Sequence, residues 1–160
     1  MRLDLDRTPA GQSELTIDGD LALGLGETGP GSVRLRGDLR VDNLESRFVV
    51  RGTLQATGPV DCDRCLTGFE LAFDVPVELV VLRDAGEETE DGDTPVVHQR
   101  DGVLDLTETL REATLLAVPQ ATICREACRG LCPQCGKDLN EGDCDCEDDE
   151  VDPRWEGLPD

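Results

Sequence analysis

Eight cysteines in four close pairs are the residues of this 160-residue sequence whose types and spacing could do chemistry. The pairs are Cys62 with Cys65, Cys124 with Cys128, Cys132 with Cys135, and Cys144 with Cys146. A tight turn lets two thiolates converge on one Zn²⁺ ion, and a structural zinc site takes four such ligands in a tetrahedron. The sequence therefore predicts two structural Zn²⁺ sites that use all eight cysteines.

Four pairs can be divided between two sites in three ways. We favour a first set of Cys62, Cys65, Cys124 and Cys128, and a second set of Cys132, Cys135, Cys144 and Cys146. In the second set, Pro133 and Gly136 supply the restricted and permissive backbone typical of a zinc knuckle. The first set would close a loop of about 60 residues and pin the C-terminal segment to the rest of the chain. One metal with several idle thiols stays an alternative, because the 144/146 spacing suits bidentate ligation only in an extended backbone.

The expected metals are structural, because a closed four-thiolate site has no open position for a water molecule. A redox role for Cys62 and Cys65 is the alternative for the same residues. This pair lies between two predicted strands instead of at a helix N-terminus, and Asp61 and Asp63 are expected to raise its thiol pKa. We therefore favour metal binding over thiol catalysis.

Other catalytic patterns are missing from the sequence. It has no Gly-x-Ser-x-Gly, and its one histidine, His98, is predicted to be a surface residue. Residues 24–29 match Gly-x-Gly-x-x-Gly, but Pro30, Gly31 and a strand follow instead of a helix, which predicts a turn. We expect a protein that is not an enzyme and takes no small-molecule substrate.

The elements that must position the cysteines are mostly strands. Residues 33–41, 48–57 and 69–82 alternate apolar and polar side chains with a period of two, which predicts strands of an antiparallel sheet. Two shorter strands are expected around Leu15/Ile17 and Leu21–Leu25. Pro76 cannot donate to a ladder and indicates an edge position or a bulge.

One amphipathic helix is predicted over residues 105–118, ended by Pro119. Asp105 and Glu108 resemble a capping box at its start. The apolar stripe that should pack on the sheet consists of Leu106, Leu110, Ala113, Thr114 and Ala117, widened by Leu115 and Leu116. Residues 84–95 carry six acids and predict a solvated loop.

The predicted fold class is α+β: a mainly antiparallel sheet with one helix and a zinc-bound C-terminal segment. Residues 1–119 form the antiparallel β domain, 120–146 the cysteine-rich zinc-binding segment, and 147–160 an acidic, flexible tail. Few residues of the cysteine-rich segment could form a core, so it is expected to fold only because metal orders it.

The formal net charge is −21, and residues 61–160 hold 27 acidic and 8 basic groups. This charge favours basic partners and disfavours binding of nucleic acid through a basic face. One local exception is an arginine stripe on the predicted sheet, Arg34, Arg36 and Arg40 with Arg47 and Arg51 nearby. Cross-strand pairing with Asp38, Asp42 and Glu45 is the simpler explanation of that stripe.

The N-terminal sequence lacks the apolar region of a signal peptide, and the aliphatic runs are too short to cross a membrane. We therefore expect a cytoplasmic protein with no membrane partner. Cytosolic thiols stay reduced, which also favours metal over disulfides.

Several motifs together resemble the YceD-like family, the large ribosomal RNA subunit accumulation proteins. They are Cys-x-Arg-Cys-Leu at 62–66, Leu-Leu-Ala-Val-Pro at 115–119, the cysteine-rich run 124–140, the Cys-Asp-Cys at 144–146 and the Asp-Pro-Arg-Trp at 152–155. The resemblance implies a cytoplasmic bacterial protein that works in ribosome assembly and is needed for accumulation of large-subunit rRNA. The chain departs from the family in its short end after Trp155.

Charge and resemblance together predict a non-enzymatic ribosome-assembly factor. We expect an acidic, zinc-stabilised protein that binds a basic ribosomal protein or assembly factor. The alternative is a module that binds rRNA directly through the arginine stripe and a zinc knuckle, which the net charge and the few aromatic residues disfavour.

Overall fold

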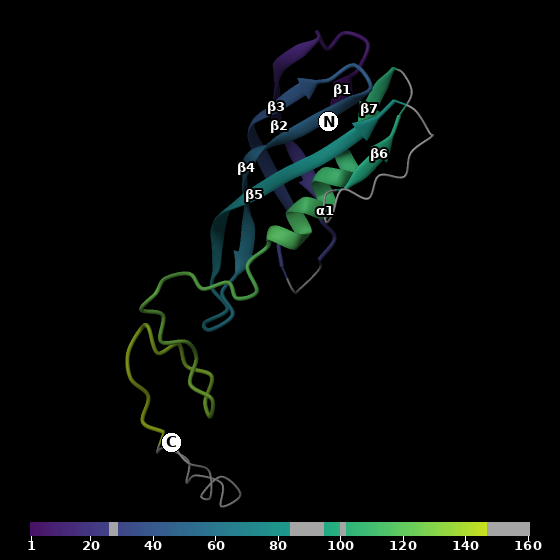
Figure 1. The fold of residues 1–160 in the computed structure, drawn as a ribbon. Coiled ribbons are helices and arrows are strands. Elements are labelled where there is room, and N and C mark those ends of the chain that lie inside the picture. The colour runs from purple at the N-terminus through teal and green to yellow at the C-terminus, as the bar shows by residue number, and fades with distance from the viewer. Residues whose placement is uncertain (26–28, 84–94, 100–101, 147–160) are drawn as a thin grey trace, which may run out of the picture.

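The computed structural model describes residues 1–25, 29–83, 95–99 and 102–146. A body of strands and one helix lies at one end of the molecule, and the cysteine-rich segment lies at the other (Figure 1). The long hairpin of β4 (Arg47–Asp61) and β5 (Gly68–Leu82) reaches from the body toward that segment. The predicted loop 84–95, except Pro95, and the predicted tail 147–160 lie outside the described residues.

The main sheet has the strand order β2-β3-β4-β5-β6. Its remaining strands are β2 (Gly11–Ala22), β3 (Ser32–Asn43) and β6 (Val96–His98). Neighbours from β2 to β5 are antiparallel, as the alternating sequence predicts, and the three long predicted strands fall inside β3, β4 and β5. The pair β5–β6 is parallel, so the sheet is mixed and not purely antiparallel. Three residues are too few for the sequence pattern to reveal β6.

The prediction of two short strands near the N-terminus is wrong. Residues 11–22 form the single strand β2, and all of them pair with β3. The acidic residues Asp18 and Asp20 fit the strand because the alternation places both on its exposed face, where they pair with Arg34 on β3. Leu23 and Leu25 lie beyond the strand, and Leu23 is buried in the core.

Pro76 occupies an edge position, as predicted. β6 pairs with β5 only from Val80 to Leu82, so at Pro76 the strand has a described neighbour on the β4 side alone. An edge tolerates the missing proline N–H because no second ladder needs it.

The helix α1 (Thr107–Ala117) is slightly shorter than predicted, and the expected capping box is wrong. The N-cap residue is Leu106, and Asp105 Oδ1 instead accepts hydrogen bonds from the backbone N–H and hydroxyl of Thr107, at 3.0 and 2.6 Å. Glu108 pairs with an arginine one turn along the helix. Among the described residues, no helix is long and apolar enough to span a membrane.

The core is built from leucine and valine and lies between the main sheet, α1 and a small sheet of β1 (Arg2–Asp4) with β7 (Val103–Asp105), which the sequence did not reveal. The largest fully buried side chains are Leu5, Leu23, Leu35, Leu39, Val41, Phe48, Val50, Leu54, Val75, Leu79, Leu106 and Leu110. The helix buries Leu110 and Thr114, and its N-cap residue Leu106 is buried too, as the predicted stripe requires. Leu116 is 89% exposed, so the stripe does not extend to it.

Candidate metal centres

The first group of four cysteines joins the tip of the β4–β5 hairpin to the segment after α1. We call Cys62, Cys65, Cys124 and Cys128 the first tetrad. Cys62 and Cys65 lie in the hairpin turn, where the Leu66 N–H donates to the Cys62 carbonyl at 2.8 Å and the Cys62 N–H donates to the Thr67 carbonyl at 3.0 Å. This tight turn points both sulfurs to the same side, as zinc knuckles do.

Polar contacts place the segment after α1 against the hairpin tip. The Asp63 N–H donates to the Thr122 carbonyl at 2.8 Å, and Asp63 Oδ2 accepts from the Thr122 N–H at 2.5 Å. Farther along, the Leu131 N–H donates to the Arg64 carbonyl at 3.0 Å. Gly130 lies here with φ of +76°, and a Cβ at this position would come within 3.0 Å of the Arg64 carbonyl oxygen, so glycine permits the close approach.

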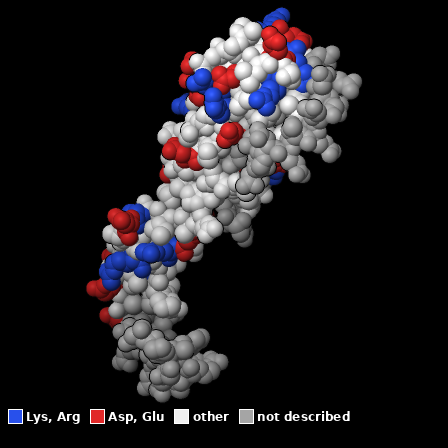
Figure 2. All heavy atoms as spheres, in the orientation of Figure 1, with Lys and Arg blue, Asp and Glu red and all other residues white. Residues whose placement is uncertain are grey.

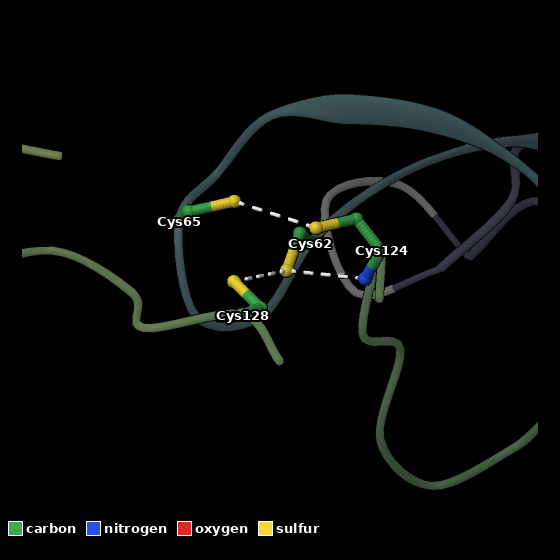
Figure 3. A group of neighbouring side chains, drawn as sticks. All are labelled: Cys62, Cys65, Cys124 and Cys128. Atoms are coloured by element: carbon green, nitrogen blue, oxygen red, sulfur yellow. Dashed lines mark hydrogen bonds between the residues drawn. The ribbon is translucent and has the colours of Figure 1, made fainter. Parts of the chain in front are cut away.

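The four sulfurs of the first tetrad converge from these two segments (Figure 3). Sγ of Cys62 lies 3.9 Å from Sγ of Cys128, and Sγ of Cys65 lies 3.8 Å from Sγ of Cys124. Four sulfurs at 2.3 Å from a central Zn²⁺ would be about 3.8 Å apart in a regular tetrahedron. A disulfide would require about 2.05 Å. The spacing thus fits a four-thiolate metal site and rules out disulfides between these pairs.

The environment of the first tetrad shifts the thiol pKa values in opposite directions. Burial raises the pKa of Cys62, but hydrogen bonds from backbone N–H groups, Cys124 first, outweigh burial and lower this pKa to about 6. The expectation that neighbouring aspartates raise it is therefore wrong. Burial and the surrounding thiols raise the pKa of Cys124 to about 12. Sulfurs this close cannot all ionise by themselves, and a dication would let them do so.

The second tetrad, Cys132, Cys135, Cys144 and Cys146, has all its sulfurs within 4.8 Å of one another. Cys132 and Cys135 form a second knuckle, in which the Gly136 N–H donates to the Cys132 carbonyl and the Cys132 N–H donates to the Lys137 carbonyl, both at 2.9 Å. Hydrogen bonds from the backbone N–H groups of Cys135 and Gln134 lower the pKa of Cys132 to about 6. The Cys135 thiol and burial raise the pKa of Cys146 to about 12.

Asp143 holds the segment that carries Cys144 and Cys146 against the second knuckle. The Lys137 ammonium donates to the Asp143 carbonyl at 2.5 Å, and the Arg129 guanidinium pairs with the Asp143 carboxylate at 2.5 Å. The two tetrads in the structure are the two sets favoured from the sequence.

The two knuckles have the same backbone conformation but differ in the type of residue that follows the second cysteine. Gly136 has φ of +72° in one, and Leu66 has φ of +58° in the other. Glycine adopts this left-handed conformation without strain, whereas a leucine is destabilised by about 1–2 kcal/mol. The Leu66 side chain is 65% exposed, so burial in the protein core does not offset that strain.

The other sequence candidates that the structure describes lie outside the two tetrads. His98 is exposed at the end of β6, as predicted. Residues 26–28 of the Gly-x-Gly-x-x-Gly stretch lie outside the described residues, and β3, not a helix, follows it. Cys62 is fully buried, which hinders the thiol exchange that a redox role needs.

Four of the five arginines of the stripe form ion pairs on the exposed face of the sheet. Arg34 lies 2.7 Å from Asp18, and Arg36 lies 3.4 Å from the same carboxylate. Arg40 and Arg51 both pair with Asp42, at 3.2 and 2.9 Å. Figure 2 shows basic and acidic side chains interspersed over this end of the molecule. Of the predicted acidic partners, Asp42 therefore serves as expected, whereas the acids of β2 were not foreseen.

Sequence reasoning missed the polar residues that support the cysteines, above all Thr122 and Asn140. Thr122 is 7% exposed and also donates its hydroxyl to the Asp61 carbonyl at 3.1 Å. Asn140 donates from Nδ2 to Sγ of Cys128 at 3.6 Å. Neither threonine nor asparagine is a usual zinc ligand, and neither residue stands in a spacing that predicts a role beside the cysteines.

Comparisons with known proteins place this chain in a family. The family model described as "Large ribosomal RNA subunit accumulation protein YceD" matches residues 50–160. An uncharacterized protein of Mycobacterium tuberculosis is 32% identical over 122 residues, which cover 76% of this chain and 58% of that protein. The uncharacterized protein YlbN of Bacillus subtilis is 26% identical over 130 residues, 81% of this chain and 72% of that protein.

A plant protein carries the family description in its name. "Large ribosomal RNA subunit accumulation protein YCED homolog 1, chloroplastic", from Arabidopsis thaliana, is 37% identical over 49 residues, 31% of this chain and 15% of that protein. The chain spans little more than half the length of its mycobacterial relatives. No solved structure matches it. Since the family model covers more than half of the chain, the protein belongs to the YceD family of large ribosomal RNA subunit accumulation proteins.

Proposed function

We propose that this protein supports accumulation of large-subunit rRNA as a non-enzymatic assembly factor that binds a basic ribosomal or assembly protein. The family description supports the rRNA connection. The observation that carries the binding mode is charge. The net charge is −21, and four arginines of the stripe already form ion pairs with three aspartates of the chain, Asp18, Asp20 and Asp42. Long-range attraction then favours cationic partners over rRNA phosphates.

Two Zn²⁺ ions, one in each tetrad, are part of the proposal. Eight cysteines in two closed sets with backbone N–H donors suit a soft, tetrahedral dication. Four thiolates around one Zn²⁺ leave a net charge of about −2 per centre, which adds to the acidity. Each ion would connect four cysteines of the chain, and these bonds would hold the cysteine-rich segment in its folded conformation.

An acid-rimmed groove beside α1 is the surface that best suits a basic partner. It has a volume of about 990 Å³ and runs from the exposed sheet face to the helix, with apolar walls that include Pro76 and the exposed Leu116. Its acids are Glu14, Asp38, Asp74, Glu78 and Glu112. These acids outnumber the two arginines of the lining, Arg40 and Arg51, so the rim has a net negative charge.

The test uses the tagged full chain and the proteins extracted from purified large ribosomal subunits. We expect retention of one or a few basic proteins at about 0.05 M salt and their loss at about 0.5 M, where charges are screened beyond a few ångströms. The double variant Glu78→Lys/Glu112→Lys should retain less, whereas Glu70→Lys, an exposed acid on β5 outside the groove, should behave like the parent.

Three outcomes would count against the proposal. They are no retention, retention that is indifferent to salt, and retention that is unchanged by the groove variants but lost with Glu70→Lys. Crosslinking of the chain to rRNA that disappears with Arg34→Glu/Arg36→Glu would instead establish the alternative, direct binding of rRNA through the stripe.

A further inference from the structure

Asn140 connects the two tetrads. It lies in the stretch between Cys135 and Cys144, which belong to the second tetrad. Its side-chain amide nevertheless donates from Nδ2 to Sγ of Cys128, a sulfur of the first tetrad, at 3.6 Å. A donor to a metal-bound thiolate stabilises the charged form of the sulfur, which strengthens a metal site.

The orientation of this amide is fixed by its other partners. Oδ1 of Asn140 accepts from the Arg129 N–H at 2.9 Å. Nδ2 also donates to Asp138 Oδ1 at 2.6 Å, and the same carboxylate oxygen accepts from the Asn140 N–H at 2.8 Å. Rotating the amide by half a turn would set its NH₂ against the Arg129 N–H, so the NH₂ must face the sulfur.

An ion in the second tetrad would also hold the loop that carries Asn140. Residues 132–146 bury little apolar surface, and of these described residues only Cys132 is buried. Their backbone is tied to the first tetrad by the Leu131–Asp138 bridge and by the Leu139 N–H, which donates to the Gly130 carbonyl at 2.9 Å. The other contacts of this loop, such as the pairs of Asp143 with Arg129 and Lys137, join exposed groups and each contribute little, so an ion that closes the second tetrad would also order Asn140.

We propose that the two centres load cooperatively, with Asn140 as the positioning residue that couples them. This inference rests on the proposed occupation of both tetrads by Zn²⁺. An ion in the second tetrad fixes Asn140, whose amide then strengthens the first centre. Loss of such a supporting contact typically lowers metal affinity about 10–100-fold. Because coupling between binding sites is reciprocal, occupation of the first tetrad raises the affinity of the second by the same factor.

Native mass spectrometry of the purified full chain, with Zn²⁺ added in steps, measures the coupling. Two equal and independent sites at half saturation put about half of the molecules in the one-metal form, whereas tenfold coupling lowers this to about a quarter. We expect the parent protein to show the depleted one-metal form. Asn140→Asp keeps the shape but removes the NH₂ donor, so it should restore the one-metal form to about half.

Two further measurements separate positioning from a general structural role. Asn43→Ala removes a side-chain amide that donates to the Thr8 carbonyl in the body of the protein, and it should load like the parent. In a Cys65→Ser/Cys124→Ser background, which lacks the first centre, Asn140→Asp should lower the Zn²⁺ affinity of the second centre less than it does in the parent protein, because only the loss of the bond to Asp138 remains. An equal loss in both backgrounds would mean that Asn140 merely stabilises its own loop.

The possible failures are distinguishable. A protein that never binds two ions refutes the metal centres themselves. A protein that binds two ions with a statistical amount of the one-metal form, or an Asn140→Asp variant as cooperative as the parent, refutes only the coupling.

Discussion

Removing the metal ions should unfold the cysteine-rich segment and leave the sheet intact. The hydrophobic contribution of residues 120–146 is small, because Ile123 and Leu131 are only partly buried. Burial of their apolar surface stabilises the segment by no more than about 3 kcal/mol. Ordering their backbone opposes folding by about 1–2 kcal/mol per residue. A structural Zn²⁺ site contributes roughly 10–16 kcal/mol, so the metal decides whether this segment folds.

The first centre also restrains the chain over a long span. Cys65 and Cys124 are 59 residues apart. Cross-linking a loop of that length removes about 4 kcal/mol of conformational entropy from the unfolded chain. The sheet should therefore remain folded without metal but unfold at a lower denaturant concentration.

Hydrogen exchange before and after treatment with a strong chelator tests both statements. The reporters are the N–H groups of Leu131 and Leu139, which bond to Arg64 and Gly130, and the control is the ladder of β4 with β5 near Val50. We expect the reporters to lose their protection and the control to keep it. Reporters that stay protected in metal-free protein would refute the reasoning.

Three more predictions concern single residues. Leu66→Gly should raise the free energy of unfolding by about 0.5–1 kcal/mol and Gly136→Ala should lower it by about 1 kcal/mol, measured by denaturant titration with Zn²⁺ present, because only glycine is unstrained at positive φ. Leu110→Ala should destabilise the protein by about 2–5 kcal/mol in the same assay, since this side chain is fully buried. Although desolvation opposes it, Arg34 holds the pKa of Asp18 below its usual value, so this carboxylate stabilises the fold above its ordinary pKa and stops doing so as the pH falls through the lowered one. Arg34→Gln should raise the Asp18 pKa in an NMR titration, and an unchanged value would contradict the ion pair.

The long strands and the cysteine sets could be predicted from the sequence, because each rests on a local pattern. A period of two runs through residues 33–41, 48–57 and 69–82, and the second cysteine set lies within fifteen residues around a knuckle marked by Pro133 and Gly136, which leaves the other two pairs to form the first set. That these cysteines bind metal stays a prediction, as do the domain boundaries.

What the sequence could not give depends on contacts between distant residues. The three-residue strands β1, β6 and β7 carry no readable period, and their pairing is set by the partners that the fold brings to them. The thiol pKa of Cys62 was misjudged because hydrogen bonds from backbone N–H groups, which have no sequence signature, outweigh burial and lower it. Asn140 was overlooked for the same reason, since only the folded loop brings it to Cys128.

The hairpin of β4 and β5 has a fixed length. Its ladder is paired from Arg47 opposite Leu82 to Asp61 opposite Gly68. Fifteen residues of paired strand span roughly 45–50 Å, and a ladder without slippage keeps that length constant. The hairpin thus fixes how far its tip, with Cys62 and Cys65, lies from its other end, and a single molecule that bound both ends of the hairpin would have to match that span.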